Sequence, residues 1–151
     1  MFLLIMILIL SSALWMFYVQ AISEAILRRR LKQQFYHVVV ESNRLQFPLV
    51  RKAVEDFGVP VDYERFRMQL KGDLVALNHL LALNAKGVSA TERLCVCELT
   101  IYFRAVFLIL VIAHTLRLSE RAAFLGLTRI LEYFANVLGE PLDTIRTIRF
   151  G

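Results

Sequence analysis

The chain opens with a long apolar stretch. Met1 to Ser23 reads MFLLIMILILSSALWMFYVQAIS and contains no charged side chain. About 22 helical residues at roughly 1.5 Å each extend roughly 33 Å, enough to cross a hydrocarbon core of about 30 Å. Trp15 and Tyr18 stand near the far end, where amphipathic rings favour the membrane interface. The pattern predicts a transmembrane helix over residues 1–23.

Positive charges after this stretch set its predicted orientation. The cluster comprises Arg28, Arg29, Arg30 and Lys32. By the positive-inside rule these residues stay cytoplasmic, so the N-terminus should face out and the rest of the chain the cytoplasm. The cluster also suits anionic lipid headgroups, although insertion alone accounts for it. A cleaved signal peptide is the alternative, since Val19-Gln20-Ala21 resembles a cleavage site, but signal peptides carry their positive charges before the apolar run.

The next part of the chain is patterned for helices. From Ile22 to Phe47 apolar residues recur at helical spacing among Arg, Lys, Gln and Glu, so the first helix is expected to continue. Pro48 should end or restart it, because the residue before a proline is disfavoured in the α region. A short helix is then expected from Leu49 to Phe57, closed by Gly58 and Pro60.

Two helices follow that have recognisable starts. Asp62 is a predicted N-cap, and the helix after it carries an apolar stripe of Tyr63, Phe66, Leu70, Leu74, Leu77 and Leu81. Its second half, LVALNHLLALNA, is apolar nearly all round, which predicts a central position in a bundle. Ser89 and Glu92 have the spacing of a capping box, so another helix should run from about Ala90 to Leu118.

A last long helix is expected after Ser119, its predicted cap. Its apolar stripe is Ala123, Phe124, Leu127, Leu131, Phe134 and Leu138, and Gly139 with Pro141 should end it. The tail over residues 141–151 is either a docking turn of helix or an extended segment. The predicted fold is therefore all-α: a transmembrane helix over 1–23, a compact cytoplasmic bundle of about four to five helices over 24–140, and the tail.

The stretch from Leu94 to Leu118 allows two interpretations. It is long enough to cross a membrane, but it contains Glu98 and Arg104. Each charge at a helix centre costs about 2.5 to 3.5 kcal/mol of insertion free energy, which nearly cancels the gain from the apolar residues. We therefore expect a buried core helix. If the stretch is instead a second crossing, Glu98 and Arg104 become functional candidates, because an intramembrane charge needs a partner or water.

Composition narrows the class of protein. Hydrophobic residues make up 58% of the chain and charged residues 21%, with 3 Pro and 2 Cys, which excludes a disordered chain and a disulfide scaffold. The formal net charge is +5, but Lys and Arg form no stripe interleaved with aromatic residues. Nucleic acid is therefore not an expected partner.

Few residues suggest chemistry. Cys95 and Cys97 point about 200° apart on a helix, so they cannot chelate one metal together, and we expect structural thiols and no metal site. His79 and His114 lie within or beside apolar helical runs, where a bundle could offer axial ligands to haem or a pigment. A lone histidine is more often a core residue with its ring N–H satisfied, so this stays the alternative. No serine lies in G-x-S-x-G, and no glycine cluster forms a phosphate loop.

The leading hypothesis for function is non-enzymatic. A membrane-anchored helical domain with more apolar surface than it can easily hide suits an accessory, assembly or scaffold subunit of a larger membrane complex. Its partners would be other membrane protein subunits and membrane lipid. The alternative is a helical-bundle carrier of a cofactor or lipid, such as haem, a pigment, quinone or an acyl chain. A membrane enzyme has the least support, because no polar constellation is apparent.

Overall fold

The computed structural model is an all-α bundle. It describes residues 1–30, 36–56 and 60–150, with the side chains of 1–28, 36–56 and 60–140. Within these ranges the chain forms six helices and no strand. They are α1 (Phe2–Arg30), α2 (Tyr36–Asn43), α3 (Phe47–Glu55), α4 (Tyr63–Leu83), α5 (Ala90–Thr115) and α6 (Arg121–Phe150). The predicted helical bundle after an apolar N-terminal helix is confirmed.

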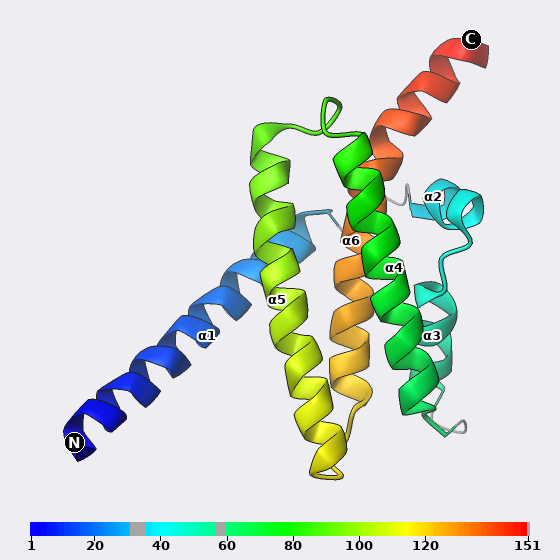
Figure 1. Ribbon diagram of the computed structural model, residues 1–151. Helices are drawn as coiled ribbons and strands as arrows, with labels where there is room; N and C mark the ends of the chain where they lie inside the picture. Colours follow the sequence, from blue (N-terminus) through cyan, green and yellow to red (C-terminus); the bar gives the residue numbers. More distant parts are fainter. Residues whose placement is uncertain (31–35, 57–59, 151) are drawn as a thin grey trace.

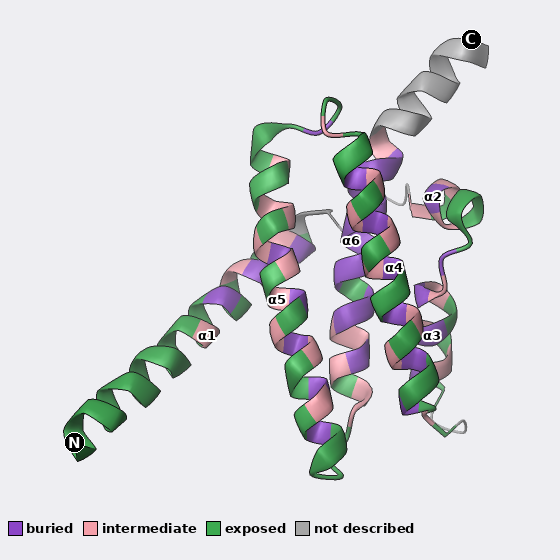
Figure 2. Ribbon diagram, viewed as in Figure 1, coloured by how far each residue is buried: buried purple, intermediate pink, exposed green. Residues whose placement is uncertain are grey.

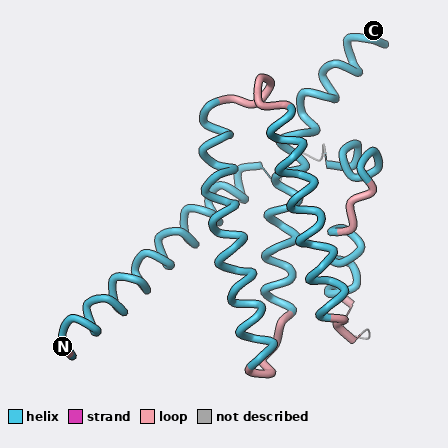
Figure 3. The backbone as a smooth tube through the Cα atoms, viewed as in Figure 1, coloured by secondary structure: helices cyan, strands magenta, loops and turns pink. Residues whose placement is uncertain are grey.

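The bundle is built around α6. Figure 1 shows α4, α5 and α6 running alongside one another, with α3 on the side away from α5 and α1 crossing the bundle obliquely. Helix α6 contacts each of the other five helices, and α1 also packs on α5. All residues from 130 to 139 of α6 are buried. Short loops join the long helices, as Figure 3 shows.

The predicted central position of α4 is wrong. Met68, Val75 and Leu83 of α4 remain exposed, and its buried side is a single stripe. Helix α6 takes the centre instead, although it carries Glu132 and Asn136 among its buried residues. Apolar side chains can stay on a surface, whereas a polar side chain can be buried where neighbouring helices surround it. Apolar content along the sequence therefore identified the wrong helix as central.

Two of the predicted helix starts are confirmed. The Asp62 carboxylate accepts a hydrogen bond of 3.2 Å from the backbone N–H of Arg65, which caps α4. At α5 the Ser89 hydroxyl accepts from the Glu92 N–H at 3.2 Å, and the Glu92 carboxylate accepts from the Ser89 N–H at 3.1 Å. Both caps bond within three residues, so the local sequence suffices to predict them.

Pro48 restarts a helix, which is one of the two predicted outcomes, whereas Pro141 does not end the last helix. Pro48 lies in the first turn of α3, which begins at Phe47 rather than Leu49; a helix needs no N–H donor there. Helix α6 begins at Arg121, which places Glu120 rather than Ser119 directly before it, and it continues through Gly139 and Pro141 to Phe150. A proline inside a helix removes one backbone hydrogen bond and crowds the carbonyl group four residues before it, which is unfavourable but does not interrupt α6. The backbone of residues 141–150 is thus part of the last helix.

Candidate functional site

Helix α1 has an exposed half and a packed half. The side chains from Phe2 to Trp15 are exposed, as is that of Tyr18. Burial begins at Val19 and continues at Ser23 and Leu27, where α1 meets α5 and α6. Residues 2–21 of a helix extend roughly 30 Å at about 1.5 Å per residue, the thickness of a bilayer core. The bundle therefore begins where the apolar stretch would leave a membrane, with no linker between them.

Two helices are long and apolar enough to cross a membrane. They are α1, over Phe2–Arg28, and α5, over Ala90–Thr115. Of the predicted basic cluster after α1, the side chain of Arg28 is exposed and lies 3.7 Å from the Glu24 carboxylate. The side chains of Arg29 and Arg30 and all of Lys32 lie outside the described residues. Contact of this cluster with a membrane surface stays a prediction.

Helix α5 is only half buried, which corrects the prediction of a buried core helix over Leu94 to Leu118. Its inward face packs on the bundle through Leu99, Phe103, Val106, Leu110 and Ala113. The opposite side exposes Leu94, Ile101, Leu108, Ile109, Ile112 and Leu116, as the alternation in Figure 2 shows. Glu98 is half-buried and Arg104 is exposed. The apolar residues of α5 thus lie on two faces of the helix, and the bundle covers only one of them.

A shallow groove separates α4 from α5. It has a volume of about 300 Å³ and is lined by Lys71, Leu74, Val75, Asn78, Phe103, Arg104 and Phe107. We call it the α4–α5 groove. Its floor is apolar, and Lys71 and Arg104 stand exposed at its rim. Neither cation forms an ion pair with another described residue, so the groove combines apolar contact area with free positive charge. Sequence patterning could not predict this groove, because its two walls lie far apart in the chain.

Polar side chains inside the bundle fix helix α3. Asp73 of α4 is 6% exposed, and its Oδ2 accepts hydrogen bonds from the backbone N–H groups of Gln46 at 2.8 Å and Phe47 at 2.6 Å. At the other end, Arg121 Nη1 donates to the carbonyl oxygens of Val54 at 2.6 Å and Asp56 at 3.2 Å. A carboxylate at the N-terminus and a guanidinium at the C-terminus both match the helix dipole. Burial raises the pKa of Asp73, although the two N–H bonds oppose this effect.

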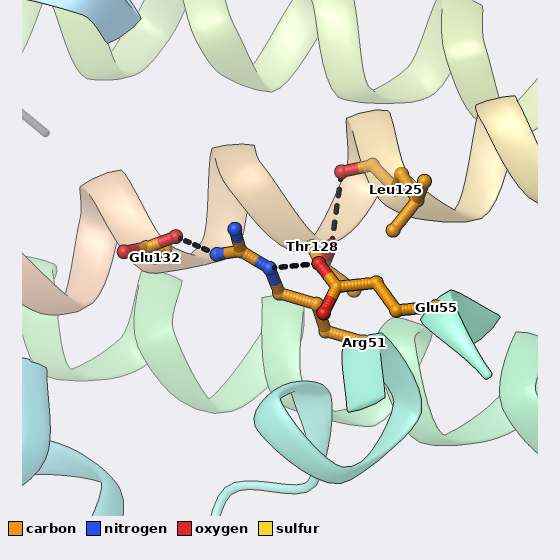
Figure 4. A network of polar contacts seen from close by, with 5 residues as sticks. All are labelled: Arg51, Glu55, Leu125, Thr128 and Glu132. Atoms are coloured by element: carbon orange, nitrogen blue, oxygen red, sulfur yellow. Dashed lines mark hydrogen bonds and ion pairs between the residues drawn. The ribbon is translucent and has the colours of Figure 1, made fainter. Parts of the chain in front are cut away.

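An ion-paired cluster joins the middle of α3 to α6, as Figure 4 shows. Arg51 donates to Glu132 at 2.6 Å and to Glu55 at 3.0 Å, and nearby the Thr128 hydroxyl donates to the Leu125 carbonyl at 2.9 Å. A second groove of about 330 Å³ lies over this cluster. Because the charges are paired with one another, the arrangement holds helices together and presents no free acid or base.

The candidate haem or pigment ligands are not brought together. His79 is exposed on the second half of α4, and His114 is exposed at the C-terminal end of α5, the opposite end of the bundle (Figure 1). The ring of His114 stacks on Tyr63 with centroids 3.6 Å apart, and its Nδ1 lies 2.6 Å from the Glu120 carboxylate. His114 thereby links α4, α5 and the start of α6.

The remaining candidates add no reactive centre. Cys95 is half-buried and Cys97 is exposed, and the two thiols are free. Ser23 and Asn136 are buried with side-chain atoms that lack hydrogen-bond partners, a feature that sequence patterning missed. Among the described residues, no group of three or more His, Cys, Asp and Glu is arranged to hold a metal ion.

No family model, curated protein or solved structure matches this chain. Its function must therefore be argued from its surfaces: an apolar helix that leaves the bundle, an exposed apolar side of α5, and the α4–α5 groove.

Proposed function

We propose that this chain is a membrane-anchored, non-enzymatic accessory or scaffold subunit of a larger membrane complex. The observation that carries the proposal is the continuity of α1. Its exposed apolar half would span the bilayer, and its other half packs into the bundle without a linker. Such an anchor would hold the bundle in one orientation against the membrane. Arg28 and the basic residues after it favour an N-terminus outside and a cytoplasmic bundle.

The α4–α5 groove is the surface we assign to a partner subunit. Met68 and Val75 leave apolar area uncovered on α4, and Lys71 with Arg104 supplies positive charge beside it. An amphipathic helix with an apolar face and an acidic residue would suit this groove.

Purification of the tagged full-length chain from its native membrane in mild detergent tests this function. We expect a partner protein to co-purify in fixed stoichiometry. Val75→Glu should abolish co-purification, because it places a charge on the apolar α4 wall of the groove. Leu49→Glu on α3 is the matched control, since both side chains are 63% exposed and neither substitution should disturb the core. Co-purification that survives Val75→Glu, or fails equally in both variants, would contradict the proposed surface.

The same preparation tests the cofactor alternative. A carrier of haem or pigment would show a visible absorption band, and His79→Ala or His114→Ala would remove it. A colourless protein with a stoichiometric partner favours the subunit role. The two histidines lie at opposite ends of the bundle, so they cannot both ligate one haem or pigment molecule within a single copy of the chain.

A further inference from the structure

The exposed apolar residues of α5 are concentrated in its C-terminal half. The α5 patch consists of Leu108, Ile109 and Ile112 and, just after the helix, Leu116 and Leu118. These side chains are between 46% and 62% exposed. The N-terminal half of α5 is different, because it intersperses exposed Leu94 and Ile101 with charged Glu92, Arg93 and Glu98. One end of α5 is therefore suited to an apolar environment and the other to water.

The position of α1 indicates what that environment is. Helix α1 packs on α5, and its exposed half leaves the bundle on the α5 side, toward the end of the bundle where α5 terminates (Figures 1 and 2). If residues 2–21 span a bilayer core of about 30 Å, the membrane surface lies near Val19, where α1 first touches the bundle. The C-terminal end of α5 lies on the same side of this contact as the exposed half of α1, which would bring it to the level of the lipid headgroups (Figure 1).

Charges around the α5 patch fit an anionic surface. Arg104 stands on its N-terminal side, and Arg117 follows α5 in a left-handed conformation with φ of 54°. Both side chains are exposed, and no Asp or Glu occurs in the sequence between Glu98 and Glu120, which is half-buried with its carboxylate 2.6 Å from His114 Nδ1. Arginine can keep its charge at the phosphate level while its stem lies along apolar surface. An apolar patch flanked by arginines is typical of helices that lie in a membrane interface.

We propose that the α5 patch is a second membrane contact, lying in the headgroup and upper acyl region of the bilayer that α1 spans. Acyl chains cover Leu108, Ile112 and Leu116, and Arg104 and Arg117 contact lipid phosphates. The inference rests on the proposed membrane anchoring by α1. It makes the protein one that crosses the bilayer once and also rests on it, with Arg104 at the boundary between the α5 patch and the α4–α5 groove.

Depth-dependent quenching in the full-length chain tests the proposal. Cys95→Ser and Cys97→Ser provide a cysteine-free background, into which Ile112→Cys, Leu10→Cys and Leu49→Cys are introduced singly and labelled with a small fluorophore. Each protein is reconstituted into vesicles whose phospholipids carry bromine either near the headgroup or near the end of the acyl chains. We expect Ile112 to be quenched several-fold more than Leu49, mainly by the shallow bromines. Leu10 should be quenched mainly by the deep bromines.

The three positions separate failure of the anchor from failure of this inference. Quenching at Leu10 with none at Ile112 would overturn the second contact and leave the anchor intact. No quenching at Leu10 would refute the anchor itself. Stronger quenching of Ile112 by deep than by shallow bromines would mean that α5 crosses the membrane. Absence of quenching at Ile112, together with disulfide cross-linking between unlabelled Ile112→Cys copies, would assign the patch to a second copy. Either result would overturn the proposal.

Discussion

Asp73 illustrates a residue whose role depends on a distant part of the chain. Its carboxylate caps the N-terminus of α3 from α4, across 26 residues of sequence. By contrast, Asp62 and the Ser89–Glu92 pair cap the helices that directly follow them, and sequence spacing predicted both. Local spacing identifies a cap only when donor and acceptor share one turn. The Asp73 cap and the Arg121 contacts with α3 could not be predicted, because they form only after the helices pack.

Replacement of Asp73 tests this long-range cap. Asp73→Ala should lower the free energy of unfolding by about 1 to 2 kcal/mol, because it leaves two backbone N–H groups without an acceptor. Asp73→Asn keeps an acceptor oxygen and should lose less. Since burial raises the pKa of Asp73 in the folded state, the folded chain binds more protons than the unfolded chain just above an unfolded pKa of about 3.9. Wild-type stability should therefore fall as pH rises through this window to the raised pKa.

Denaturant titrations of the full chain in detergent at a series of pH values measure both effects. The variant Asp73→Asn lacks the titrating carboxyl, so its stability should fall less over the same window. An identical pH slope in the wild type and in Asp73→Asn would contradict the assignment of a raised pKa to this residue.

At the scale of elements, apolar content alone misplaced two helices. Sequence patterning predicted that α4 is central and that residues 94–118 form a buried helix. In the structure α6 is central, and α5 is covered on one face only. An exposed leucine carries little penalty, so α4 and α5 can keep apolar surface exposed. Helix α6 buries Glu132 because Arg51 reaches it from α3. Which helix is surrounded depends on such pairings between elements, and a single sequence does not show them.

The attachment of α3 to α6 predicts an asymmetry between two substitutions. The side chain of Glu132 is 11% exposed, whereas that of Arg51 is 38% exposed. Arg51→Ala should cost roughly 2 kcal/mol, because it leaves a mostly buried carboxylate without its cation. Glu132→Gln should cost less than about 1 kcal/mol, because Arg51 keeps water and Glu55 as partners. Thermal or denaturant unfolding of each variant gives the comparison, and a larger loss for Glu132→Gln would refute it.

At the scale of the whole molecule, the sequence predicted an apolar N-terminal helix joined to an all-α bundle, and the structure confirms this architecture. The periodicity of apolar residues is strong over long helices, so their existence could be predicted. The α4–α5 groove and the α5 patch could not be predicted, because each depends on which helix faces remain uncovered after packing.

Topology is the prediction that belongs to this scale. Reporter fusions placed after Gln46 and after Gly151 should both report a cytoplasmic location, since only α1 is proposed to cross the membrane. The intact fusion should also retain residues 1–23, which separates an anchor from a cleaved signal by mass. Reporters on opposite sides of the membrane would show that α5 is a second crossing.

The absence of a linker between the exposed and packed halves of α1 also has a mechanical meaning. A helix accommodates a thinner or thicker bilayer by changing its tilt. Helix α1 runs unbroken from Phe2 to Arg30 and packs on the bundle from Val19 onward. Any change in its tilt would therefore rotate the whole bundle. A change in bilayer thickness would then change the orientation of the α4–α5 groove relative to other proteins in the membrane.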